Sequence, residues 1–91
     1  MNEQAIVNPD ELRRFANDLA KFNNTLDDIS SRLVAQFNQL GDTWRDQEHA
    51  KFADQFQETM TSIRHFREAS DEQIPFLIRK AEAADEYLHR R

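Results

Sequence analysis

Three histidines and their acidic neighbours are the side chains that could bind a metal or take part in catalysis. Asp46 and His49 are three residues apart, as are His65 and Glu68, so each pair would share one face of a helix. A di-metal helical bundle needs Glu-x-x-His on two helices and a further Glu from each of the other two. Both pairs here fall in one half of the chain, in a different order and among polar neighbours. We therefore interpret them as solvated helix surface and expect no metal site.

The sequence also gives no evidence for nucleophilic catalysis or for a phosphate-binding loop. The chain has no Cys, which excludes disulfides, thiolate nucleophiles and most structural zinc sites. No serine has a neighbouring His in a recognisable nucleophile arrangement, and a chain with one Gly has no glycine-rich phosphate loop. We therefore expect no catalytic residue and no cofactor, and predict that the protein is not an enzyme.

The net charge and the lengths of the apolar runs restrict the classes of partner that the protein is expected to bind. The 12 Lys and Arg against 17 Asp and Glu give a formal net charge of −5, which disfavours binding to nucleic acid. The apolar runs are too short for a membrane span, and no basic region followed by an apolar core marks the amino terminus. We expect a protein made in the cytoplasm without stable membrane insertion, and any export to use a route without a cleaved leader.

The first half of the chain predicts one long helix, from about residue 9 to 40. Asn8 suits the N-cap, and Pro9 suits the first helical position because its missing N–H costs nothing there. The apolar residues then recur in alternating steps of three and four, which is a heptad seam and not a strand pattern. The members of this seam are Leu12, Phe15, Leu19, Phe22, Leu26, Ile29 and Leu33, followed by Phe37.

The only Gly and the only Trp of the chain lie close together near its midpoint, and they predict a turn at residues 41–43. Gly41 stands where a helix often ends on a left-handed residue. Asp42 or Thr43 could then cap the following helix. Trp44, placed just inside that helix, could fold over the turn and close the end of the hairpin.

The second half predicts another long helix, from about residue 44 to 88. Pro75 lies within it and should either kink the helix or end it and restart it, because proline removes one hydrogen bond and clashes with the preceding turn. The apolar residues of this helix that we assign to the core are Phe52, Phe56, Ile63 and Phe66.

Two long amphipathic helices joined by a tight turn predict an all-α fold, an antiparallel two-helix hairpin that forms one domain over residues 1–91. At about 1.5 Å per residue the first helix would be roughly 48 Å long, so the hairpin must be an extended rod. The apolar face is wider than two helices can cover. We therefore predict dimerisation into an elongated four-helix bundle through the seam residues.

With these features in place, the chain resembles the WXG family of small secreted helical hairpins, the early-secreted-antigen-like proteins associated with type VII secretion in Actinobacteria and Firmicutes. The likeness covers nearly the whole chain, including its length, the Trp-bearing turn, and Ala50 and Phe52 after it. The family's tripeptide is here Trp44-Arg45-Asp46, so Asp46 replaces the Gly of the motif. Asp46 is expected in the first turn of the second helix, where a carboxylate meets the helix dipole.

The resemblance implies a small secreted substrate, or an adaptor or chaperone, of a type VII-like secretion system. Its partner would be a second copy or a different hairpin of the same kind, with a secretion ATPase or a larger effector as further partners. Gly41, Trp44 and Asp46 would shape an exposed hairpin tip. Family members carry an export signal in which Tyr is followed four residues later by an acid, but here Tyr87 is followed by Arg91. The resemblance then implies export with a partner that supplies the signal, an intracellular adaptor role, or a system with other rules.

One alternative remains open on the sequence alone. The same helices could form a cytosolic coiled-coil structural subunit, or a chaperone that binds amphipathic helices, with no connection to secretion. Detection of the protein in the culture supernatant or only in the cytosol separates these two hypotheses.

Overall fold

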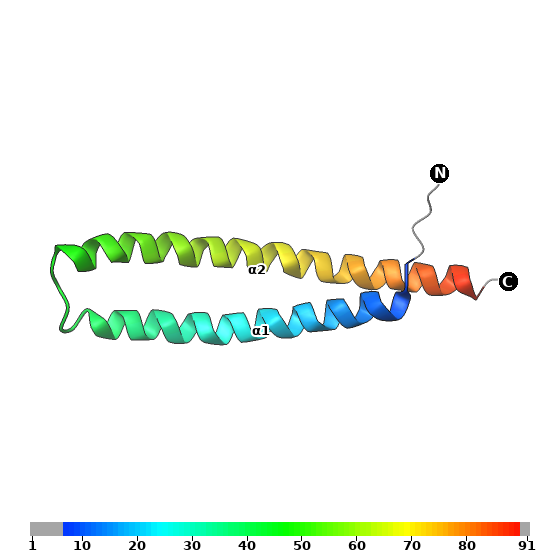
Figure 1. Cartoon of the computed structure of the whole chain (residues 1–91), viewed down its shortest axis with the longest axis horizontal. Helices are drawn as coiled ribbons and strands as arrows, with labels where there is room; N and C mark the ends of the chain where they lie inside the picture. The colour runs from blue at the N-terminus through cyan, green and yellow to red at the C-terminus, as the bar shows by residue number, and fades with distance from the viewer. Residues whose placement is uncertain (1–6, 90–91) are drawn as a thin grey trace.

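The computed structural model describes residues 7–89 as two long antiparallel helices, α1 (Pro9–Leu40) and α2 (Gln47–Leu88), joined at one end (Figure 1). The molecule extends over 68 × 26 × 15 Å, and α2 continues past the first residues of α1 at the open end of the hairpin. The described residues contain no strand. The predicted all-α helical hairpin and its extended shape are confirmed.

Helix α1 begins as its sequence predicts. The Asn8 side chain accepts hydrogen bonds from the backbone N–H groups of Asp10 and Glu11, at 2.9 and 3.2 Å, and Pro9 occupies the first helical position. These bonds satisfy two of the backbone donors that a helix leaves free at its start. Asp10 and Glu11 also place negative charge at the positive end of the helix dipole.

Helix α2 begins three residues later than the sequence indicates. Asp46 is its N-cap, with an extended backbone and a side chain that accepts a hydrogen bond from the His49 N–H at 2.9 Å. The expectations that Asp42 or Thr43 caps this helix, that Trp44 lies within it, and that Asp46 lies in its first turn are therefore wrong. Residues 41–46 connect the two helices.

Helix α2 runs through Pro75 as one element, so it does not end and restart there. Proline removes the hydrogen bond of its own missing N–H, but the neighbouring turns keep theirs. The seam of α2 that faces α1 continues on both sides of Pro75, and this packing holds the helix together across the missing bond.

The expectation for Gly41 is also wrong. Its φ and ψ are −63° and −14°, which is right-handed helical backbone, and no Gly among residues 7–89 has a positive φ. Its N–H bonds to the carbonyl oxygens of Phe37 and Asn38, at 3.3 and 3.2 Å, so the chain leaves α1 by a tightened last turn. The left-handed freedom of glycine is therefore not what this position uses.

We expect Gly41→Ala to change the free energy of unfolding by less than about 1 kcal/mol, because alanine adopts this backbone without strain. The added Cβ would lie 3.3 Å from the Asn38 carbonyl oxygen and 3.9 Å from Nε2 of His49, so only a shift of a few tenths of an ångström is needed. Urea unfolding monitored by circular dichroism measures the change. A clearly larger loss would indicate a left-handed Gly41.

The interface between α1 and α2 is narrow and is built on small side chains. Ala16 and Ala81 are completely buried, and Asn23 and Ser70 are nearly so. Small residues let two helices approach closely. Along α2, a line of half-buried and buried residues follows steps of three and four: His49, Ala53, Phe56, Met60, Ile63, Arg67, Ser70, Ile74, Leu77, Ala81 and Ala84. Thr61, Ile78 and Asp85, each next to a member of this line, are also half-buried.

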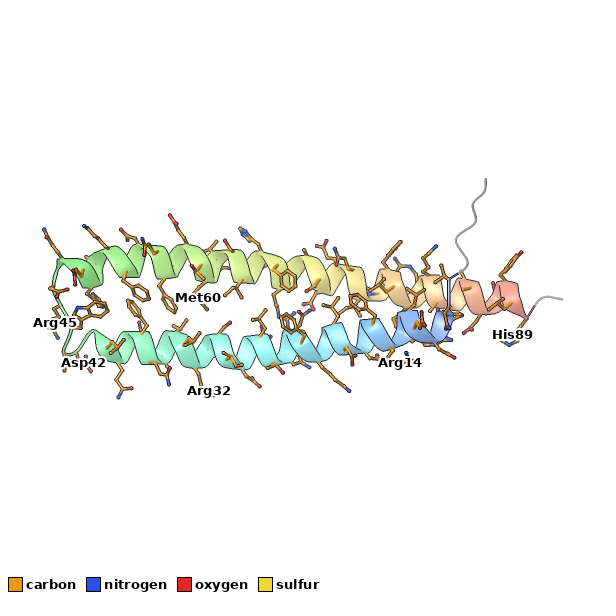
Figure 2. All side chains as sticks on the ribbon, viewed as in Figure 1. Arg14, Arg32, Asp42, Arg45, Met60 and His89 are labelled. Atoms are coloured by element: carbon orange, nitrogen blue, oxygen red, sulfur yellow. The ribbon has the colours of Figure 1, made fainter. Side chains whose placement is uncertain are left out.

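The seam predicted for α1 is rotated relative to this interface. Ala16 and Asn23, which face α2, come directly after Phe15 and Phe22, so these two phenylalanines lie about 100° around the helix from the buried line. Figure 2 shows the labelled Arg14 and Arg32 on the side of α1 away from α2. The predicted seam therefore divides into half-buried leucines (Leu12, Leu19, Leu26) and exposed residues (Phe15, Phe22, Ile29, Leu33).

Candidate functional site

The hairpin tip contains a cluster of five rings, which we call the tip cluster: Phe37 from α1, Trp44 from the connection, and His49, Phe52 and Phe56 from α2. Phe37 stacks on His49, with ring centres 5.1 Å apart and planes 3° apart. Trp44 meets His49 edge to face at 4.9 Å. Phe37 also contacts Phe52 and Phe56, at 5.7 and 4.9 Å. Trp44 closes the hairpin end, as predicted, although it does so from outside the helix.

His49 is therefore part of the tip cluster, and its interpretation as solvated helix surface is wrong. It is half-buried between Phe37 and Trp44, and its Nε2 is enclosed without a hydrogen-bond partner. Asp46 interacts with the backbone N–H of His49 and not with its ring. The second pair differs, because both His65 and Glu68 are exposed.

Three hydrogen bonds fix the connection that carries Trp44. The Trp44 N–H donates to the Leu40 carbonyl at 2.8 Å, and the Arg45 side chain donates from Nε to the Gly41 carbonyl at 2.9 Å. Asp46 supplies the third, as the cap of α2. The tryptophan is thereby held at both ends of the connection, by the last turn of α1 and by the first turn of α2.

Asp46→Ala should lower the free energy of unfolding by about 1 kcal/mol, because the His49 N–H loses its acceptor at a helix start. Asp46→Gly should cost only a few tenths of a kcal/mol, because glycine is itself tolerated at an N-cap. Thermal unfolding of the two variants beside the parent protein measures the difference. Equal losses would show that the carboxylate does not act as the cap.

One face of the hairpin carries the second candidate feature, a line of exposed apolar side chains. We call it the apolar strip, and its members are Phe15, Phe22, Ile29, Leu33, Phe52 and Phe66, each 43 to 59% exposed. Phe22 of α1 contacts Phe66 of α2 edge to face, with ring centres 6.0 Å apart, so both helices contribute to the same face. Phe52 lies two heptads before Phe66, in the same column of α2.

On the opposite edge of the hairpin, polar side chains of α1 and α2 contact each other. Arg67 of α2 donates to both carboxylate oxygens of Asp27 on α1, at 2.7 and 2.6 Å, and also pairs with Asp71. Buried Asn23 donates to Asp71 at 3.2 Å and accepts from Ser70 at 3.0 Å. We call these five residues the polar layer.

An Arg13–Asp85 ion pair lies on the same side of the hairpin, near its open end. Because Arg13 and Asp27 stand four residues after the buried positions 9 and 23, they flank the buried line on the side away from Phe15 and Phe22. The hairpin therefore has one polar edge and one apolar face.

The polar layer makes stability depend on pH in acid. The two hydrogen bonds from the Arg67 guanidinium hold the pKa of the Asp27 carboxyl below its ordinary value of 3.8. Because the folded-state pKa is the lower one, this contribution is fully present above pH 3.8 and is lost as pH falls through the folded-state value.

We expect acid unfolding followed by circular dichroism to show a decline in stability below about pH 4. Asp27→Asn should make that decline shallower, and Asp28→Asn, an exposed neighbour with no hydrogen-bonded partner among residues 7–89, is the matched control. Identical acid profiles for the two variants would contradict the role of the Arg67–Asp27 pair.

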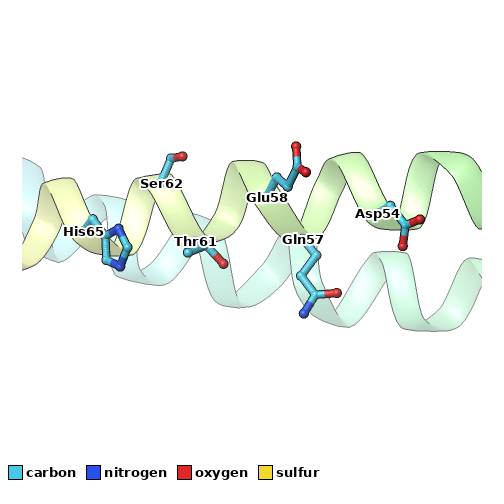
Figure 3. A pocket seen from close by; sticks show the side chains of 6 residues that line it. All are labelled: Asp54, Gln57, Glu58, Thr61, Ser62 and His65. Atoms are coloured by element: carbon cyan, nitrogen blue, oxygen red, sulfur yellow. The ribbon is translucent and has the colours of Figure 1, made fainter.

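The surface of α2 also contains a shallow hollow. Its lining residues come from successive turns of α2, and all of them are polar (Figure 3): Asp54, Gln57, Glu58, Thr61, Ser62 and His65. Within residues 7–89, no three side chains of the metal-binding types gather around one point.

The sequence missed the polar layer, although a signal for it exists. Arg67 and Ser70 occupy two places in the continuous three-and-four spacing of α2, between Ile63 and Ile74. Asn23 stands one heptad after buried Ala16. A search for polar residues that interrupt a regular seam would have found all three.

The last predicted site residue, Tyr87, lies near the end of α2 and is 75% exposed. Arg91, four residues further on, lies outside the described residues. Neither helix of the described chain is apolar over a stretch long enough to cross a membrane.

Comparison with protein families identifies one that matches this geometry. The model of the WXG100 family, described as proteins of 100 residues with WXG, matches residues 4–86. No curated protein and no solved structure matches the chain.

Proposed function

Because the chain belongs to the WXG100 family, we propose that it is a non-enzymatic hairpin that works by pairing with a similar hairpin. In this proposal it serves a type VII-like secretion system as a small substrate or as an adaptor for a larger effector. Family membership supports the association with such a system, and the apolar strip provides the means of pairing.

The observation that carries this proposal is the exposure of the apolar strip. Phe15, Phe22 and Phe66 are 59, 51 and 49% exposed, although phenylalanine normally buries most of its surface. They form one face and are not scattered, as the Phe22–Phe66 contact shows. A contiguous apolar face of this kind marks a protein interaction site. Two helices from a partner would cover it and complete a four-helix bundle.

The carboxyl end of α2 bears on how export would occur. Tyr87 is exposed and accessible to a receptor, but the residue four positions later is Arg91 and not an acid. In the proposed function the partner hairpin or effector therefore supplies the export signal, and this chain travels with it. The tip cluster, at the other end of the rod, provides the docking feature for a secretion ATPase.

The test is export in the organism that encodes the chain. We expect tagged protein in the culture supernatant when the secretion ATPase is active, and its retention in cells when the ATPase is deleted. A cytosolic lysis marker is the control. Full retention in cells with an active ATPase would contradict a secreted role and favour the alternative of a cytosolic coiled-coil subunit or helix-binding chaperone.

A further inference from the structure

We infer that Met60 is a site of reversible oxidation by hydrogen peroxide and related peroxides, and that its sulfoxide loosens the hairpin near the tip. The inference goes beyond the proposed function, because this modification needs no partner hairpin. The chain has two methionines and no Cys, and Met1 lies outside the described residues. Met60 therefore carries the one sulphur whose surroundings the structure describes.

The place of Met60 in the interface follows from the Arg67–Asp27 ion pair, which joins α2 to α1 at the polar edge. One heptad nearer the tip stand Met60 on α2 and Val34 on α1. Because the helices are antiparallel, an equal step toward the tip on each helix brings the two new residues opposite each other. Figure 2 shows Met60 on the side of α2 that faces α1. Met60 and Val34 therefore take the place of the ion pair at the same edge.

This part of the interface is packed less tightly than the part beyond the polar layer. Within residues 7–89, every buried residue belongs to the polar layer or lies between it and the open end: Pro9, Ala16, Asn23, Ser70 and Ala81. Residues 31–36 of α1 are all exposed, and Val34 is 40% exposed although it faces α2. Met60 is itself half-buried. A small oxidant in the solvent can therefore reach its sulphur.

Met60 lies away from the apolar strip. It stands six residues before Phe66, which corresponds to about 120° around the helix. It shares a heptad column with Arg67 and not with Phe52 and Phe66. A partner that covers the strip therefore leaves the edge beside Met60 open to solvent.

The reaction is a two-electron oxidation of the thioether. A lone pair of the sulphur attacks one oxygen of hydrogen peroxide, the O–O bond breaks, an S–O bond forms, and the second oxygen leaves as water after proton transfer. The thioether becomes a sulfoxide, and the peroxide is reduced. Methionine sulfoxide reductases reverse the change.

The sulfoxide changes the interface because it turns an apolar side chain into a polar one. Its oxygen is a poor neighbour for Val34. Arg64, an exposed residue four positions after Met60, is a surface neighbour whose guanidinium can donate to that oxygen. Phe56, four positions before Met60, contacts Phe37 in the tip cluster. Movement of the oxidised side chain toward Arg64 therefore removes support next to the tip cluster.

The first test is the reactivity of Met60 in the folded full chain. We expect hydrogen peroxide to oxidise Met60 at a rate within about tenfold of that of free methionine in the same solution, because susceptibility follows exposure. Peptide mass spectrometry locates the added oxygen. The rate should not depend on protein concentration, since the strip is on another face. Oxidation of Met60 only in urea, or a rate that falls as concentration rises, would overturn the inference.

The second test is the effect of the sulfoxide. We expect it to raise the unfolding equilibrium constant on the order of tenfold and to shift the emission of Trp44, the chain's only Trp. Treatment with methionine sulfoxide reductases should restore both. Urea unfolding and fluorescence measure the changes. An oxidised protein with the unfolding curve and emission of the parent would overturn the inference.

Two variants isolate position 60. Met60→Leu nearly conserves volume and should unfold as the parent does, with no response to peroxide. It keeps Met1, so it also controls for oxidation there. Met60→Gln places a polar group at the same edge without an oxidant and should weaken the hairpin as the sulfoxide does. A Met60→Gln protein as stable as Met60→Leu, or a Met60→Leu protein that peroxide still weakens, would overturn the inference. None of these measurements involves export or pairing, so the inference and the proposed function can fail separately.

Discussion

Phe37→Ala is expected to lower the free energy of unfolding by about 2 to 3 kcal/mol, which is somewhat less than the loss for a fully buried phenylalanine. Phe37 is half-buried and its ring contacts those of His49, Phe52 and Phe56, so its removal leaves a cavity in the centre of the tip cluster. Aromatic pairs add about 0.5 to 1.5 kcal/mol beyond the area they bury. Urea unfolding at fixed protein concentration measures the loss.

Phe15→Ala is the matched control, because it removes the same side chain from a position that is 59% exposed and has no aromatic partner among residues 7–89. We expect it to cost the isolated hairpin less than about 1 kcal/mol. Its main effect should be on self-association, as a weaker dependence of the unfolding midpoint on protein concentration. Equal, concentration-independent losses in both variants would contradict the division between tip cluster and apolar strip.

The bounds of α1 were predictable because all of their determinants are local. Asn8 and Pro9 specify the start by cap geometry, and the spacing of the apolar residues specifies how far the helix continues. None of these signals depends on the contacts that α1 makes with α2. The fold class followed for the same reason, since two long helices joined by a short connection must lie antiparallel.

The side of α1 that faces α2 was not predictable in the same way. A heptad of Phe and Leu identifies an apolar surface, but it does not say which part of that surface the chain buries against itself. Close approach favours small residues such as Ala16 and Ala81, and it moves the rings of Phe15 and Phe22 to the rim of the interface. The choice depends on the packing of both helices together, and a pattern within one helix does not contain it.

The start of α2 was misplaced because several residues before it can cap a helix. Asp42, Thr43 and Asp46 all have suitable side chains, and local preference does not separate them. In the structure Trp44 contacts His49 and Phe52 from the connection before α2, and Asp46 is the cap.

The structure also accounts for the departure from the family motif. The third position of the Trp-x-Gly tripeptide is here the N-cap of α2, and both Gly and Asp are accepted at such a position. Asp46 therefore preserves the helix start that the motif position requires in this chain. Because Gly and Asp are both accepted at an N-cap, Asp46→Gly should lower the free energy of unfolding only slightly.

The polar layer and the apolar strip have different relations to a partner. The strip is exposed on one face, whereas the polar layer lies within the hairpin and on its opposite edge. A buried polar group in an apolar seam fixes the register of the helices at some cost in stability. The layer therefore sets the alignment of α1 with α2, and this alignment determines which residues of the two helices form the strip.

Asn23→Asp is expected to lower the free energy of unfolding at neutral pH by about 2 to 4 kcal/mol, because it places a carboxylate where only 1% of the residue is exposed. The Asn23 Nδ2 lies 3.2 Å from Asp71, so the new charge would replace a hydrogen-bond donor with a like charge at contact distance. The Ser70 hydroxyl would still donate to the new side chain, and Arg67 is nearby, which limits the loss.

Asn24→Asp makes the same chemical change at the next residue, which is exposed, and should leave stability within about 0.5 kcal/mol of the parent. The pH dependence provides a second criterion. Because burial and the neighbouring Asp71 raise the pKa of the new carboxyl above its unfolded value, protonation on lowering the pH toward 5 should recover part of the loss in Asn23→Asp. Urea unfolding at pH 7 and pH 5 measures both effects, and an Asn23→Asp protein as stable as Asn24→Asp at both values would show that the polar layer does not hold the two helices in register.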